Sequence, residues 1–224
     1  MTQNEMSMPR VFVVGASLTL QFGPYLEREL AGRMHYDRKR ATDGKRAEDN
    51  LDVAQGASGG DSSRVLAYLK DRRQNDPIPA DILLLSCGLH DLKTHPTTKA
   101  KQVPIEQFES NLRAITQEVA AMGLTLAWLR ITPVVDEIHN ARASFHRYQA
   151  DVDRYNAIAD GVMRDADAHV IDFAAFCQAL LPESLIDHVH YDEAARARQA
   201  KFIAEHLLKI AAASGDWPAT TALP

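Results

Sequence analysis

The chain has 224 residues, of which 46% are hydrophobic and 25% charged, with a formal net charge of −5. This size and composition predict a single globular domain over residues 1–213, followed by a loose tail at 214–224. The acidic balance and the lack of a strongly basic run argue against nucleic acid as a partner. No apolar run reaches the roughly 18 residues that a membrane span needs, so we expect no membrane partner.

Strands and helices alternate along the chain. Continuous apolar runs predict buried strands, and apolar residues at helical spacing predict helices. The predicted strands cover 10–15, 81–88, 124–133 and 169–173, with a possible short strand near 51–54. The predicted helices cover 24–33, 61–73, 104–123, 145–166 and 192–213, and the stretch 134–144 has the polar composition of a loop.

This alternation places the chain in the α/β class. Strands that alternate with helices form a parallel sheet with helices on both faces. Because crossovers are right-handed, we expect a three-layer flavodoxin-like fold with a parallel sheet of about five strands. Ligands bind such sheets outside the carboxyl ends of the strands. The segments at that edge are Ala16–Thr19, Gly88–Leu92 and Pro133–Asp136.

The cysteines and the amino-terminal residues bear on the cellular compartment. Cys87 and Cys177 lie far apart and show no metal-binding or redox spacing, which fits a reducing environment. The first ten residues, MTQNEMSMPR, contain no apolar stretch of the kind found in signal peptides. We therefore expect a cytoplasmic location.

A serine, a histidine and an aspartate have the spacing of a nucleophilic site. Ser17 follows the first strand in VVGASLT, and its hydroxyl needs a base before it can attack at neutral pH. Asp187 and His190 stand three residues apart in DHVH. The carboxylate can accept the Nδ1 proton of the imidazole, which leaves Nε2 to take the serine proton. The Ser17 N–H, a glycine N–H in SGGDS and the His90 side chain are candidate donors to a developing oxyanion.

These segments resemble, in order, the sequence blocks of the SGNH hydrolases, the GDSL-type esterase superfamily. VVGASLT resembles the first block, with Ser17 as nucleophile, and DHVH matches the Asp-x-x-His pair at Asp187 and His190. GASGGDSS resembles the second block, in which Gly60 matches the oxyanion glycine best and Gly59 is the alternative. LLLSCGLHDL resembles the third block. The resemblance implies an esterase that hydrolyses small acyl esters, such as acetylated sugars or short-chain esters, through an acyl-enzyme and without a cofactor or metal.

The chain departs from the family pattern at two positions. Ala16 replaces the aspartate of the first block, and His90 replaces the asparagine that donates to the oxyanion. Since a histidine also carries a ring N–H donor, we expect His90 to take over the role of the asparagine. A neighbouring carboxylate such as Asp91 is a candidate for holding His90 in place.

Several alternatives stay open at this level. The same triad would serve an acyltransferase with an alcohol acceptor, and the two departures fit a catalytically dead carbohydrate- or acyl-binding relative. GASGG also has the form of a nucleophile elbow around Ser58, although the stretch before it is a poor strand. HVHYD, with His206 beyond it, is a possible metal-binding pattern. The sequence does not indicate an oligomeric state.

Overall fold

The computed structural model describes residues 8–213, so the tail predicted at 214–224 lies outside the described residues. A five-stranded parallel sheet forms the centre of the fold, in the order β2-β1-β3-β4-β5. Val11 lies opposite both Tyr36 and Ile82, which sets the register on the two sides of β1. The strands are β1 (Arg10–Val14), β2 (His35–Arg38), β3 (Ile82–Leu85), β4 (Thr125–Leu129) and β5 (His169–Ile171).

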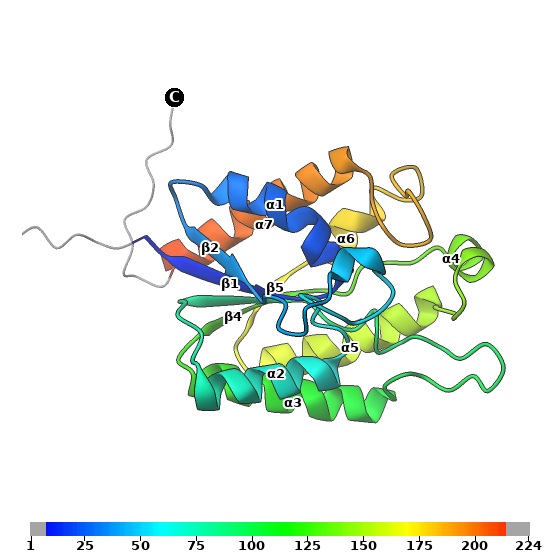
Figure 1. The fold of residues 1–224 in the computed structure, drawn as a ribbon, viewed down its shortest axis with the longest axis horizontal. Helices are drawn as coiled ribbons and strands as arrows, with labels where there is room; N and C mark the ends of the chain where they lie inside the picture. Colours follow the sequence, from blue (N-terminus) through cyan, green and yellow to red (C-terminus); the bar gives the residue numbers. More distant parts are fainter. Residues whose placement is uncertain (1–7, 214–224) are drawn as a thin grey trace, which may run out of the picture.

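Helices cover both faces of this sheet (Figure 1). α1 and α7 pack together on one face with α6 near them, and α2, α3 and α5 cover the other. The helices are α1 (Ser17–Leu30), α2 (Ser62–Asn75), α3 (Ile105–Ala121), α4 (Asp136–Arg142), α5 (Gln149–Asp165), α6 (Phe173–Gln178) and α7 (Glu193–Ala213), with a 3-10 helix at Ala47–Asp49. The predicted α/β class and three-layer, flavodoxin-like strand order are confirmed.

The core divides into two layers because successive strand residues point to opposite faces. Phe12, Leu83 and Trp128 pack with the helices α2, α3 and α5. Val13, Leu84 and Ala127 pack with α1 and α7. All six are at most 3% exposed, which explains why these strands read as continuous apolar runs.

The structure corrects four predicted elements. The second strand is His35–Arg38, not the stretch near 51–54; it is an edge strand of alternating exposed and half-buried residues, so no apolar run marks it. α1 begins at Ser17 rather than at residue 24 and contains Pro24, because Phe22, Leu26 and Leu30 bury one continuous helical stripe. α4 occupies the predicted loop, and α6 follows β5 unpredicted; both are too short to show a clear period.

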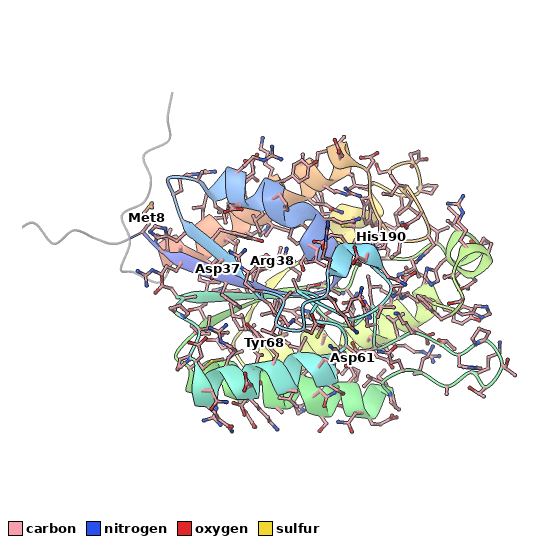
Figure 2. The ribbon with its side chains drawn as sticks, viewed as in Figure 1. Met8, Asp37, Arg38, Asp61, Tyr68 and His190 are labelled. Carbon is pink, nitrogen blue, oxygen red and sulfur yellow. The ribbon has the colours of Figure 1, made fainter. Side chains whose placement is uncertain are left out.

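The site is positioned by the carboxyl edge of the sheet. β1, β3 and β4 end at Val14, Leu85 and Leu129, so the segments after them meet at one edge. The segment between α6 and α7 reaches the same edge, and Figure 2 shows its His190 beside the amino-terminal end of α1. Within residues 8–213, the helices are all too short or too polar to cross a membrane.

Candidate active site

Ser17 stands at the junction between β1 and α1. Gly15 leaves no room for a side chain at this junction, since a Cβ there would lie 2.3 Å from Thr19 Cγ2 and 3.1 Å from the Ser86 carbonyl oxygen. Ala16 is the N-cap residue of α1 and contributes no side-chain cap. The first N–H groups of a helix have no partner within it, and the helix dipole adds positive potential there. The hydroxyl of Ser17 therefore lies at an end of α1 that favours negative charge.

Ser17, His190 and Asp187 form one hydrogen-bonded chain. Ser17 Oγ lies 2.9 Å from His190 Nε2, and Asp187 Oδ2 lies 2.7 Å from His190 Nδ1. Ser17 and His190 are 7% and 2% exposed. The three side chains thus have the arrangement in which an imidazole relays a proton from a hydroxyl while a carboxylate orients it.

The backbone around Asp187 keeps the carboxylate of this residue ionised. Asp187 Oδ1 accepts hydrogen bonds from the backbone N–H groups of Val189 and His190, both at 2.8 Å. Partial burial raises the pKa of Asp187, but the hydrogen bonds from the His190 ring and from these two N–H groups outweigh it, and the pKa lies well below its usual value. The carboxylate is therefore charged at neutral pH and fixed in direction.

The second glycine-rich loop presents one free N–H to the same place. The N–H of Gly59 donates to the Gly15 carbonyl at 2.7 Å and is occupied. Gly60 lines the pocket beside Ser17, and its N–H has no hydrogen-bond partner in the described part of the chain. Its φ of +73° favours glycine, and a Cβ there would lie 2.7 Å from Ala54 Cβ.

His90 lines this pocket as well. It is 3% exposed, and its ring forms no hydrogen bond with any residue from 8 to 213. Burial, together with the positive charges of Lys93 and Arg147, holds the pKa of His90 well below its usual value. The imidazole is therefore neutral at pH 7 and carries one N–H donor.

Asp91 does not hold His90 in place, contrary to the expectation from the sequence. Its carboxylate accepts the Ser62 N–H at 2.9 and 3.1 Å, and Asn111 Nδ2 donates to Ser62 Oγ at 2.8 Å. Asp91 is completely buried, and burial raises its pKa to about 7. This carboxylate ties the segment after β3 to the start of α2 and forms no hydrogen bond with the His90 ring.

Sequence reasoning missed two charged residues of the pocket. Asp52 and Arg147 line it with Ser17, Gly60 and His90. Asp52 comes from a loop without regular structure, and Arg147 precedes α5 within a stretch that reads as one helix. Neither has a motif or spacing that marks it, so only the tertiary structure reveals them.

The alternative sites from the sequence do not assemble. Ser58 is buried without a hydrogen bond to its hydroxyl, and no strand leads directly into it; the element before it is the 3-10 helix Ala47–Asp49. His188 pairs with Asp52 at 3.1 Å, while the ring of His206 contacts the Phe202 carbonyl on α7. No group of three or more metal-ligating side chains gathers anywhere in residues 8–213.

The family model of the GDSL-like Lipase/Acylhydrolase family matches residues 13–198. The chain belongs to this family. It is a carboxylic ester hydrolase of the SGNH/GDSL type, as the resemblance of its sequence blocks implies. No curated protein matches the sequence closely enough to count as a relative.

Solved structures of esterases share the fold. A lipase/acylhydrolase from Enterococcus faecalis has a TM-score of 0.67 at 14% identity and covers 91% of this chain and 97% of its own. The acetyl xylan esterase AlAXEase has a TM-score of 0.63 at 16% identity, with coverage of 88% and 99%. The psychrotrophic esterase EstA from Pseudoalteromonas sp. has a TM-score of 0.59 at 14% identity, with coverage of 91% and 99%. At these identities the likeness shows the fold alone.

Proposed function

We propose that this chain is a serine esterase that hydrolyses small acyl esters through a Ser17–His190–Asp187 triad. The observation that carries the proposal is the unbroken contact chain from Ser17 Oγ to His190 Nε2 and from His190 Nδ1 to Asp187. Ser17 attacks the ester carbonyl as His190 takes its proton, and Asp187 stabilises the imidazolium. His190 then returns the proton to the departing alcohol.

The second half of the reaction uses the same groups. Water attacks the acyl group on Ser17 while His190 removes a proton from it, and the acid leaves as Ser17 recovers its hydrogen. In both halves the N–H groups of Ser17 and Gly60 and the ring N–H of His90 donate to the oxyanion. The free N–H of Gly60 and the neutral, unbonded ring of His90 support these roles.

The size of the pocket supports a small acyl group. The partly open pocket beside Ser17 has a volume of about 20 Å³, enough for roughly one water molecule. A short acyl group such as acetyl would displace the walls of this pocket less than a longer chain would. The names of two similar structures, an acetyl xylan esterase and an acetyl-xylooligosaccharide esterase, agree with acetylated sugars as a substrate class. The cytoplasmic location expected from the sequence stays a prediction.

A fluorophosphonate probe followed by peptide mass spectrometry tests the triad. We expect an adduct on Ser17 that is lost in His190→Ala, together with hydrolysis of 4-nitrophenyl acetate in the unmodified enzyme. Ser58→Ala is the matched control and should label normally. Labelling at Ser58, or no labelling and no turnover, would contradict the proposal. Acyl transfer to an added alcohol in excess of acid release would show that the triad serves an acyltransferase.

A further inference from the structure

Arg147 is a buried cation in the wall of the active-site pocket. It is 2% exposed and lines the pocket with Ser17 and His90. Its Nε donates to the Leu89 carbonyl at 2.7 Å, and its backbone N–H donates to Asn140 Oδ1 at 2.9 Å. Its Nη1 is buried and has no hydrogen-bond partner among the described residues. Buried polar groups are nearly always paired, so this one calls for an acceptor.

No carboxylate hydrogen-bonds to this guanidinium in the described part of the chain, although the charges of Asp52 and Asp187 act on it from farther away. No ion pair involving Arg147 occurs in the described part of the structure, and Asp52, which shares the pocket wall, pairs with His188 Nε2. Burial lowers the pKa of Arg147 to about 10, so the side chain remains charged at neutral pH. A buried charge without a hydrogen-bonded counter-ion is costly to a fold. An anionic oxygen from a bound molecule would remove that cost.

A larger groove adjoins the pocket, and Arg147 lines the pocket but not the groove. It has a volume of about 550 Å³, and its lining includes Asp52, Lys93 and Phe145. Asp52 lines both spaces, and the Arg147 guanidinium lies 4.8 Å from the centre of the Phe145 ring. Lys93 Nζ lies 4.3 Å from the same ring. Under the proposed function the acyl group occupies part of the pocket beside Ser17, so the alcohol would extend past Arg147 toward this groove.

We propose that Arg147 binds a carboxylate on the alcohol part of the substrate. The preferred substrates are then small acyl esters of hydroxy acids or sugar acids rather than of neutral alcohols. The planar guanidinium suits a carboxylate because it can donate two parallel N–H bonds. This inference rests on the proposed esterase function and adds the charge of the leaving alcohol to it.

Matched ester pairs test the inference. Kinetics of 3- and 4-acetoxybenzoate are compared with those of the corresponding acetoxybenzamides, which have the same shape without the charge. We expect the ratio of kcat/KM, acid over amide, to fall by about tenfold or more in Arg147→Gln, the usual effect of losing a charged hydrogen bond. Arg147→Lys should give an intermediate ratio, because lysine keeps the positive charge but cannot donate two parallel N–H bonds. The ratio within one variant does not depend on the fraction that folds.

Arg113→Gln is the control, since Arg113 is an exposed arginine on α3 that pairs with Glu109 and Asp165. Its ratio should equal that of the unmodified enzyme. Equal ratios in the unmodified enzyme and Arg147→Gln would overturn the inference and leave the esterase function intact. A second pair, 4-nitrophenyl hemisuccinate and 4-nitrophenyl pentanoate, differs by a carboxylate on the acyl chain. If the enzyme prefers the charged ester in this pair alone, the inference is also overturned, because the carboxylate would then belong to the acyl part. Hydrolysis of none of these esters would overturn the esterase proposal itself.

Discussion

The backbone N–H of Gly59 donates a hydrogen bond of 2.7 Å to the carbonyl oxygen of Gly15. This bond joins the two glycine-rich turns that precede α1 and α2. Ser17 lies two residues beyond Gly15 and Gly60 lies one residue beyond Gly59, and both line the pocket. One backbone contact thus fixes the spacing between the proposed nucleophile and its proposed amide donor.

We expect Gly60→Ala to lower kcat/KM by about a hundredfold, the usual cost of losing one oxyanion donor. The new Cβ would lie 2.7 Å from Ala54 Cβ and 2.8 Å from Arg64 Cδ, so the loop must shift and carry the N–H with it. Gly32→Ala is the matched control, because its φ of +72° imposes similar strain while nothing lies within 4 Å. The backbone strain should cost each variant about 1 kcal/mol of stability, with a further loss in Gly60→Ala from the steric clash, and equal kinetics in the two would refute the role of Gly60.

His90→Ala should lower kcat/KM by about a hundredfold, whereas His90→Asn, which restores the family's amide donor, should retain most of the activity. Burial and the charges of Lys93 and Arg147 keep the pKa of His90 well below its usual value, so the ring stays neutral over the working range. The acid limb of the pH–rate profile should therefore be unchanged in His90→Asn. Activity in His90→Ala within tenfold of the unmodified enzyme would rule out the donor.

Asp187→Asn should reduce kcat by about a thousandfold or more, because an amide cannot hold the His190 ring in the required tautomer. Asp192→Ala is a control on the same segment, since Asp192 accepts the Ala195 N–H at 2.7 Å at the start of α7. It should lose about 1 kcal/mol of stability as a helix cap and keep its turnover. Steady-state kinetics and urea unfolding of both variants separate the two effects.

Asp91 should make the stability depend on pH between about 4 and 7. Burial raises its folded pKa from 3.8 to about 7, so the unfolded chain releases this proton at a lower pH than the folded chain does. The free energy of unfolding that Asp91 contributes then falls as pH rises through this window and is constant above it. In urea unfolding, the unmodified protein should lose stability relative to Asp91→Asn from pH 4 to pH 7. A constant difference would show that Asp91 keeps an ordinary pKa.

The sequence by itself determines the α/β class and the main strands, because apolar runs such as 81–88 need burial on both faces. Ser17, Asp187 and His190 are also recognisable from it, since their order and spacing match a family pattern. The sequence does not reveal the edge strand His35–Arg38 or the early start of α1. An exposed edge strand needs no apolar run. Pro24 lies inside α1, so the sequence suggests that the helix begins there, although packing extends it back to Ser17.

The tertiary structure alone decides which polar groups face the pocket. Ser17 and His190 are 173 residues apart, and only the meeting of strand ends at one sheet edge brings them within 2.9 Å. The same folding turns Asp91 toward Ser62, occupies the N–H of Gly59, and buries Arg147 without a hydrogen-bonded carboxylate in the described part of the chain. Hydrogen-bond partners and desolvation depend on distances between segments remote in the chain, and no local spacing encodes those distances.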